Sequence, residues 1–217
     1  MIKFKFDTGK YDFKGIVQDY LNIKDLSNAH SEYLDSGVVV KEGKDQRTSI
    51  HSSFYEKMDS DPIFKKTYDL FIKDFIKPKL FESEDIIFQR FPTFRAHYPM
   101  NLAVFEFHKD KDYNHDKNEI NFFLPLTDCF ETNTVWIESR EDLGDFSPIV
   151  CEYGEIVMFD GANLKHGNKM NTTDITRISF DFRILKKSFY NEGIYKTSKT
   201  KGMKFSIGEY FQELESY

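Results

Sequence analysis

Short runs of alternating apolar and polar residues fill the second half of the chain and predict a series of β-strands. The runs are rich in β-branched and aromatic side chains and are separated by Pro, Gly, Asn and Asp. They span residues 86–88, 94–98, 102–107, 119–124, 134–138, 154–159 and 177–183. Short strands that follow one another without helices between them are typical of a β-sandwich or a double-sheet jelly roll.

The chain before position 80 shows helical periodicity instead. Aromatic residues recur there at spacings of four, three and four, at Phe64, Tyr68, Phe71 and Phe75. This spacing places them on one face of a helix that packs against a sheet. Asp61 and Pro62 are suited to begin that helix, and Pro78 is expected to end it. Residues 11–26 are a second predicted helix, and residues 36–41 are a short strand.

The chain is long enough for one domain with a sizeable core. Its 217 residues are 40% hydrophobic and include 23 Phe and 12 Tyr, which favours a β-rich core with aromatic-lined cavities. We predict a mainly β (α+β) fold in a single domain, residues 1–217. Within it, residues 1–84 form a mixed, largely helical layer, residues 85–185 form the jelly-roll core, and residues 186–217 form a C-terminal extension.

Charge and cysteine content narrow the class of partner. The formal net charge is −6 and no basic stripe is visible, which argues against a nucleic-acid partner. No apolar run reaches the ~18 residues that a membrane span needs, and we expect no membrane partner. The two cysteines, Cys129 and Cys151, lack metal-ligand spacing and are expected to be reduced and packed. We expect a cytoplasmic protein that acts on a small molecule, and a homodimer is compatible with the sequence.

Three residues have the chemistry of a metal site. His108 and Asp110 follow the predicted strand 102–107, and their i, i+2 spacing directs both side chains to one side of an extended backbone. His166 follows the predicted strand 154–159 across a Gly/Asn loop. Two imidazoles and one carboxylate can bind one face of an octahedral ion and leave the opposite face open for substrate and dioxygen.

Each part of this set also has a simpler interpretation. The histidine and aspartate pair is a weak motif alone, because residues 109–112 read equally well as a solvated run of charges. His166 has the alternative role of a turn histidine with locally satisfied nitrogens. His115 is a rival ligand, but its neighbour Asp116 has i, i+1 spacing, which sends the two side chains to opposite sides of an extended chain.

A third segment adds an anion-binding candidate. Arg177 begins a predicted strand 11 residues after His166, and Ser179 lies two positions further on and faces the same way. Arginine suits a dicarboxylate partner because its planar, permanently charged fork can pair with a carboxylate through two hydrogen bonds. A surface salt bridge is the alternative role for Arg177.

Together, these segments resemble the metal- and cosubstrate-binding pattern of the Fe(II)/2-oxoglutarate-dependent dioxygenases. The pattern consists of His108 and Asp110, then His166, then Arg177 and Ser179. The spacing of its second half is similar to that of the phytanoyl-CoA hydroxylase branch. Residues 107–127, 132–138 and 166–168 are similar to the StrG-like group of streptomycin biosynthesis. The resemblance covers roughly residues 85–210.

The resemblance implies a fold and a set of roles for these residues. The fold would be a double-stranded β-helix, which is a cupin-like jelly roll, beneath a helical N-terminal layer. His108, Asp110 and His166 would bind Fe(II). Arg177 would pair with the C5 carboxylate of 2-oxoglutarate, and Ser179 would assist it.

The resemblance also implies the chemistry. Dioxygen would react at the open face of the iron, and a C–H bond of a small polar metabolite would be hydroxylated or otherwise oxidised. The expected substrate is a sugar, an aminocyclitol or a nucleotide-linked biosynthetic intermediate. Because Asp110 is present, no position is vacated for chloride, and hydroxylation is favoured over halogenation.

Several further residues have open roles at this point. Asn121 either contacts the C1 carboxylate of 2-oxoglutarate or pairs with the backbone. Arg95 and Arg183 are candidates for binding an anionic group of the substrate. His115 is expected to pair with a neighbouring carboxylate such as Glu119.

Two other functional classes fit parts of the pattern. One is a non-catalytic jelly-roll module that binds a carbohydrate, and the other is a cupin-like sugar isomerase or a zinc hydrolase on the same scaffold. Neither class needs Arg177 together with three metal ligands, which favours the oxygenase. Residues 190–202 form a basic loop with the composition of a lid, and residues 210–217 are expected to form a short helix or to dock on a neighbouring subunit.

Overall fold

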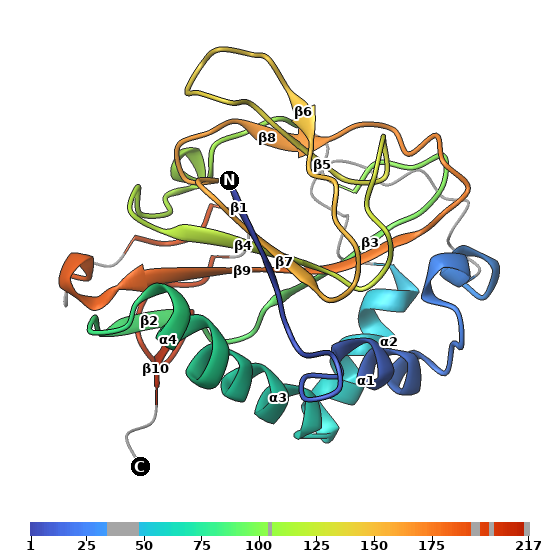
Figure 1. Ribbon diagram of the computed structural model, residues 1–217, viewed down its shortest axis with the longest axis horizontal. Helices are drawn as coiled ribbons and strands as arrows, with labels where there is room; N and C mark the ends of the chain where they lie inside the picture. Colours follow the sequence, from blue (N-terminus) through green and yellow to red (C-terminus); the bar gives the residue numbers. More distant parts are fainter. Residues whose placement is uncertain (34–47, 104–105, 192–195, 200–201, 215–217) are drawn as a thin grey trace.

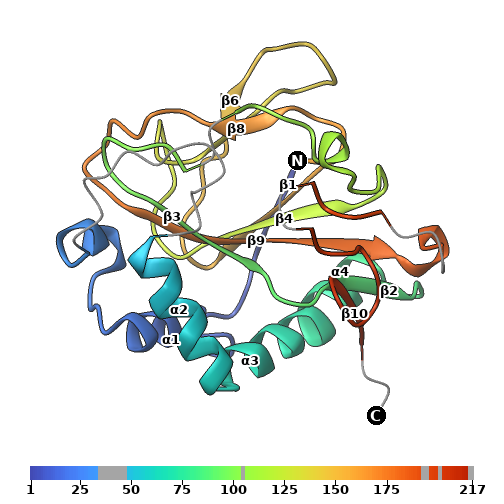
Figure 2. The same cartoon turned by 180° about the vertical axis from the view of Figure 1, so that it is seen from behind.

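The computed structural model describes residues 1–33, 48–103, 106–191, 196–199 and 202–214. Within these residues the chain forms a helical layer, a seven-stranded sheet and a three-stranded sheet, stacked in that order (Figure 1). The view from behind shows the same arrangement, with helices on one face of the large sheet and the small sheet over the other (Figure 2). No helix in this described part is long and apolar enough to span a membrane.

The large sheet is antiparallel and is organised around one long strand. Its order is β1-β7-β4-β9-β2-β10, and β3 also pairs with β9. The strands are β1 (Ile2–Lys5), β2 (Ile86–Gln89), β3 (Thr93–His97), β4 (Ile120–Pro125), β7 (Glu155–Phe159), β9 (Arg177–Lys186) and β10 (Phe211–Glu213). β9 pairs with β4 along one edge and with β3 and then β2 along the other, so three strands of the sheet are joined through it.

The small sheet is also antiparallel and has the order β6-β5-β8. Its strands are β5 (Val135–Ile137), β6 (Ser147–Pro148) and β8 (His166–Asn168). The backbone of Phe107 passes so close to Gly167 that an added Cβ at Gly167 would lie 3.1 Å from the Phe107 Cα. A glycine at this position therefore lets the segment before His108 lie against β8.

The two faces of the large sheet have opposite character because side chains alternate along a strand. On the helical side, Phe180 and Phe182 of β9 belong to the main apolar cluster and contact helical aromatic rings. The ring centroids of Phe64 and Phe180 are 4.8 Å apart, and those of Tyr68 and Phe182 are 5.3 Å apart. The other face of β9 carries Arg177, Ser179, Asp181 and Arg183. The main core therefore lies on the helical side of the sheet. On the other side the polar residues of β9 lie beside a smaller apolar cluster that includes Phe123 and Ile137.

The helical layer comes from the first part of the chain. It contains α1 (Phe13–Leu21), α2 (Ser49–Ser60), α3 (Ile63–Phe71), a π-helical turn (Ile72–Ile76) and α4 (Lys77–Leu80). Short 3-10 helices span Leu26–Ser31, Asp110–Tyr113 and Lys187–Phe189. Asp12 begins α1 with a side-chain hydrogen bond to the N–H of Gly15, which satisfies one unpaired donor of the first turn.

Most predicted elements are confirmed, and four predictions need correction or lie outside the described residues. The predicted strand 102–107 is wrong for its described residues, which form no strand, while residues 104–105 lie outside the described part. The strand predicted at 36–41 also lies outside it. The helix predicted near the C-terminus is wrong, because Phe211–Glu213 instead form β10 at the edge of the large sheet, paired with β2.

Pro78 does not end the predicted helix. The turn Ile72–Ile76 is π-helical, and the N–H of Lys77 bonds to the carbonyl of Ile72, five residues back. The wider turn moves the hydrogen-bond ladder by one residue, which accommodates the missing N–H of Pro78. The helical segment therefore continues to Leu80.

Candidate metal centre

His108 and His166 face each other across a backbone bridge. The N–H of each residue donates to the carbonyl of the other at 3.0 Å, which makes them a directly opposed antiparallel pair. Residues opposed in this way direct their side chains to the same side, and the two ring centroids lie 4.8 Å apart. Two ligands separated by 58 positions are thus brought together by a single bridge that extends the small sheet.

Local hydrogen bonds fix the orientation of both imidazoles. The Nδ1 atom of His108 lies 2.9 Å from the carbonyl oxygen of Glu106, and Nδ1 of His166 lies 3.1 Å from that of Leu164. A carbonyl can only accept a hydrogen bond, so Nδ1 carries the proton in each ring and donates it. The lone pair of Nε2 is then available to a metal ion, because the hydrogen bond at the other ring nitrogen sets the tautomer.

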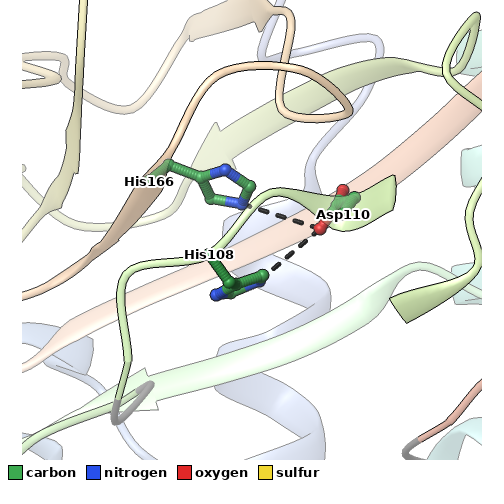
Figure 3. Close-up of side chains that lie close together, drawn as sticks. All are labelled: His108, Asp110 and His166. Carbon is green, nitrogen blue, oxygen red and sulfur yellow. Dashed lines mark ion pairs between the residues drawn. The ribbon is translucent and has the colours of Figure 1, made fainter. Parts of the chain in front are cut away.

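Asp110 completes the group and is itself held by the backbone. Its N–H donates to the carbonyl of Gly161 at 2.9 Å, and it begins the 3-10 helix Asp110–Tyr113. Its Oδ1 atom lies 3.6 Å from Nε2 of His108 and 3.7 Å from Nε2 of His166. Figure 3 shows the two imidazoles and the carboxylate pointing toward one another.

The donor set and its spacing fit a divalent transition metal. One ligand atom from each of the three residues lies within 4.8 Å of the others. Two neutral imidazoles and one carboxylate on one side of an ion form the facial arrangement that Fe(II) accepts, with the other positions open. Burial lowers the pKa of His166, although the Asp110 carboxylate opposes that shift, so this ring is suited to the neutral state that a ligand needs.

The second oxygen of Asp110 is occupied by protein. Oδ2 accepts hydrogen bonds from Nε of Arg183 at 2.7 Å and from Nδ2 of Asn121 at 2.6 Å. Burial alone would raise the pKa of Asp110, but the Arg183 guanidinium and the two imidazoles outweigh it and hold the pKa well below its usual range. The carboxylate is therefore ionised and offers Oδ1 to the space between the histidines.

Arg177 is a buried cation with unused donors. It is 1% exposed, and its Nη1 donates to Oγ of Ser179 at 3.1 Å. Its Nε and Nη2 atoms are buried and have no hydrogen-bond partner within the described residues. Burial lowers the pKa of Arg177 to about 10, a mark of how poorly solvated the charge is. Unpaired buried donors on a guanidinium are a reason to expect an anionic ligand there.

Comparison with known proteins identifies the family. No family model matches the sequence. The streptomycin biosynthesis protein StrG of Streptomyces griseus is 33% identical over 210 residues, which cover 96% of each chain. The chain belongs to the StrG family. The StrG-like resemblance of the sequence motifs is thereby confirmed, since the alignment spans both ligand-bearing segments and the Arg177 strand.

Solved structures show which fold this StrG-family chain has. A non-heme monooxygenase solved as a ThoJ–Ni complex has a TM-score of 0.52 and 12% identity, covering 98% of this chain and 78% of that one. The ThoJ apo form has the same TM-score with 11% identity over the same shares. At this identity the likeness shows a shared fold, which is one used by non-heme oxygenases.

Asn121 occupies a place that the sequence pattern left open. Its Nδ2 faces Asp110, while its Oδ1 is buried without a hydrogen-bond partner in the described part. The opposite amide orientation would set two oxygens against each other, so the assignment follows from the ionised carboxylate. A Cβ at Gly161 would lie 2.7 Å from this amide, so a glycine there makes room for it. The atom left for a ligand is an acceptor, which suits a hydroxyl, an amine or water better than a carboxylate.

The other polar residues singled out in the sequence have partners within the protein. The expected pairing of His115 with Glu119 is confirmed, at 2.7 Å between Nδ1 and Oε2. Arg95 pairs with Asp181 at 2.8 Å between Nε and Oδ1. Both this arginine and Arg183, which were candidates for an anionic substrate group, therefore bind carboxylates of the chain itself.

Sequence reasoning missed the role of Arg183 beside the metal ligands. Its position carried a usable signal, because it lies on the same face of β9 as Arg177 and Ser179, at even spacing. Polar residues at every second position of an otherwise buried strand indicate a site rather than solvent. What the sequence could not indicate is that Asp110 reaches this strand.

Ion pairs also tie the two ligand loops together, which no motif indicated. Nζ of Lys109, next to two ligands, lies 2.9 Å from a carboxylate oxygen of Glu141 and 2.9 Å from one of Asp142. Lys165, next to His166, reaches Asp142 at 3.0 Å. One loop thus contacts the lysines that flank both halves of the metal centre, although its own carboxylates are exposed and each pair is worth little alone.

Proposed function

We propose that this chain is a non-haem Fe(II)- and 2-oxoglutarate-dependent dioxygenase that hydroxylates, or otherwise oxidises, a C–H bond of a small polar metabolite. One observation carries the proposal. A cluster of two histidines and one aspartate lies on the same side of the large sheet as a buried arginine with two unpaired donors, Arg177. A metal-binding module or an isomerase would need the cluster but has no use for the arginine.

In this proposal three side chains hold the iron, each through one atom. His108 and His166 supply Nε2, and Asp110 supplies Oδ1. Fe(II) bound there, together with 2-oxoglutarate and dioxygen, would supply the oxidising chemistry by which one oxygen atom enters the substrate C–H bond and the other enters succinate, with loss of carbon dioxide. The protein contributes by leaving one face of the ion without protein ligands, so that cosubstrate, dioxygen and substrate can meet there.

Arg177 and Ser179 would bind the C5 carboxylate of 2-oxoglutarate. The guanidinium has Nε and Nη2 unpaired, and these adjacent donors match the two oxygens of a carboxylate. Its Cζ lies 5.7 Å from the centre of the Phe123 ring, so an apolar surface lies beside the charge. Asn121, also proposed as a cosubstrate contact, would act through its unpaired Oδ1, by way of a bound water or a substrate hydroxyl.

The architecture and the comparisons support the finer family placement. Two stacked antiparallel sheets, with the candidate ligands between them, support a double-stranded β-helix over residues 85–185. The spacing from Gly154 through His166 to Arg177 is the reason to propose the phytanoyl-CoA hydroxylase-like branch. Residues 1–84 would be its covering layer and residues 186–217 its extension. The name of the S. griseus relative, a streptomycin biosynthesis protein, supports a biosynthetic intermediate as substrate. We propose a sugar, an aminocyclitol or a nucleotide-linked compound.

An anaerobic titration tests this function without knowledge of the substrate. Fe(II) is added to the apoprotein, followed by 2-oxoglutarate, and the visible charge-transfer band of the chelated iron is recorded. We expect a band only when both are present. The band should be absent in Asp110→Ala and His166→Ala, whereas Arg177→Gln should need a much higher concentration of 2-oxoglutarate while still binding iron. Iron binding without any band would contradict 2-oxoglutarate dependence.

A further inference from the structure

The metal carboxylate is held asymmetrically. Within the described residues, both hydrogen bonds to Asp110 from other side chains end on Oδ2, one from Arg183 at 2.7 Å and one from Asn121 at 2.6 Å. Neither ends on Oδ1, the atom that faces the two imidazoles. A carboxylate without such partners can bind a metal through one oxygen or through both, so these bonds select the first mode.

The guanidinium that makes this contact is fixed from behind. Nη1 of Arg183 lies 3.3 Å from the hydroxyl oxygen of Tyr210 and 3.5 Å from Oε1 of Gln89. The Tyr210 hydroxyl also donates to Oε1 of Gln89 at 2.9 Å, which closes a small buried network. Gln89 belongs to β2, and Tyr210 precedes β10 near the C-terminus. The C-terminal extension therefore reaches the metal centre through one arginine.

We propose that Arg183 is a positioning residue of the metal centre, which with Asn121 restricts Asp110 to coordination through Oδ1 and is itself oriented by Tyr210 and Gln89. The proposal rests on the proposed metal site. Restricting the aspartate to one oxygen keeps an additional coordination position open for exogenous ligands. If the long side chain of Arg183 moved freely, it could not hold Asp110 in one orientation. The guanidinium therefore needs partners on its far side.

A simpler role for Arg183 is charge balance beside a buried carboxylate, and the two roles predict opposite results. If Arg183 acted only through its charge, its removal would take a cation away from a divalent ion and tighten metal binding. If it positions Asp110, its removal weakens metal binding, because the Asn121 amide alone then holds the orientation of the carboxylate. Loss of an outer-shell partner of this kind typically costs about 10- to 100-fold in metal affinity.

The test measures the affinity of the apoprotein for Co(II), a spectroscopic substitute for Fe(II), in wild type, Arg183→Met and Arg95→Met. Arg95 is the matched control, because it is also a half-buried arginine on the inner face of the same sheet and pairs with a carboxylate, that of Asp181, at 2.8 Å, which is not one of the candidate metal ligands. We expect Arg183→Met to bind Co(II) about 10- to 100-fold more weakly. Arg95→Met should bind as wild type does.

Milder variants decide the question if Arg183→Met fails to fold. Arg183→Lys keeps the charge but loses the fork, and it should remain weakened if position matters and recover fully if only charge matters. Tyr210→Phe removes one hydroxyl and should weaken Co(II) binding by roughly 2- to 10-fold. In both variants the Co(II) d–d absorption should change, since an aspartate bound through both oxygens alters the coordination number.

The outcomes separate this inference from the proposed function. Wild-type protein that binds no Co(II) would remove the metal site itself and the proposed function with it. Wild-type protein that binds Co(II), with equal or tighter binding and an unchanged spectrum in the Arg183 and Tyr210 variants, would overturn the positioning role alone. Weaker binding in Arg183→Met and Arg95→Met to the same extent would also overturn it, because the effect would then be a general one of lost ion pairs.

Discussion

The two faces of β9 show how one strand serves both stability and chemistry. The face toward the helices carries four buried apolar side chains, Ile178, Phe180, Phe182 and Ile184. The face toward the small sheet carries Arg177, Ser179, Asp181 and Arg183. On this face Arg183 donates to the candidate ligand Asp110, and Arg177 donates to Ser179. Because successive side chains point to opposite faces, a single run of ten residues supplies the floor of the core and the wall of the site.

The two faces of β9 also differ in whether their buried groups have partners. On the helical face each aromatic ring packs against others, as where Phe180 lies 4.8 Å from Phe64 and 5.6 Å from Phe94. On the inner face Arg177 keeps two donors unpaired within the described residues. A buried charge without partners opposes folding. The face toward the small sheet, the inner face, therefore lowers the stability that packing on the face toward the helices, the outer face, provides. Single substitutions test this difference between the two faces.

Removal of the Asp110 carboxylate is expected to have the largest effect of these changes, and the effect is on metal affinity. Asp110→Ala should lose metal binding by more than the about 10- to 100-fold that an outer partner costs, because a ligand atom itself is lost. Isothermal titration with Fe(II) under anaerobic conditions measures it. Asp116→Ala is the control, since Asp116 belongs to the rival pair with His115. Retained binding in the first variant and loss in the second would move the site to that pair.

A cavity on the face of β9 that packs against the helices should lower the free energy of unfolding without changing metal affinity. Phe180→Ala removes a ring that is 2% exposed and should lower the free energy of unfolding by about 3–5 kcal/mol. Urea denaturation measures the loss, and a metal titration at low temperature measures the affinity of the folded protein. We expect that affinity to match wild type. A large drop in metal affinity with little loss of stability would contradict the separation of the two faces.

Removal of Arg177 should raise the free energy of unfolding of the apoprotein, whereas removal of the Phe180 ring lowers it. Arg177→Met replaces a buried cation with two unpaired donors by an apolar side chain, so the apoprotein should become more stable by about 1–3 kcal/mol. Arg95→Met is the matched control and should destabilise the apoprotein, because it leaves Asp181 without the guanidinium at 2.8 Å. Both changes are read by urea denaturation. Destabilisation by both substitutions would mean that Arg177 has a structural partner.

The smallest expected effect is a pH dependence that comes from the inner face of β3. Burial, and secondly the charge of Arg177, lower the pKa of His97 to about 3. The unfolded chain, with a histidine pKa of about 6.5, binds a proton below that pH while the folded protein does not. Stability from this group is therefore present above pH 6.5 and is lost as the pH falls toward 3.

The expected size follows from that difference in proton binding. Between pH 7 and pH 5.5, His97 should account for about 1 kcal/mol of lost unfolding free energy. Urea denaturation of wild type and His97→Asn at both values isolates it, because other titrating groups are common to the two proteins. An identical pH slope in both proteins would show that folding does not lower the pKa of His97.

Local patterns predicted much of the fold and the identity of the metal ligands. The strands that contain Phe94, Phe122 and Phe180 follow from alternation, and α3 follows from aromatic spacing. Residue chemistry and i, i+2 spacing made His108 and Asp110 candidates, and the resemblance of the combined pattern to a known family singled them out together with His166, because the pair alone is a weak motif. Pro78 was misjudged because its effect depends on whether the preceding turn can widen, which is not a property of the proline itself.

Contacts between distant segments were beyond the reach of these patterns. Nothing local indicates that Arg183 binds Asp110, 73 positions earlier, or that Tyr210 stands behind it. The extended strand expected before His108 is also absent from its described residues, and one bridge to His166 takes its place. Long side chains such as arginine reach several partners, and the choice among them depends on which strands become neighbours.

The sequence by itself determined which residues have the chemistry for a metal and an anion, and which strand faces are apolar, because both properties belong to side chains and to the two-residue repeat of a β-strand. Only the tertiary structure decided that His108 opposes His166, that Oδ1 rather than Oδ2 of Asp110 faces them, and that two donors of Arg177 find no partner among the described residues. These are outcomes of register and layer stacking, which bring segments together through the burial of the opposite, apolar face.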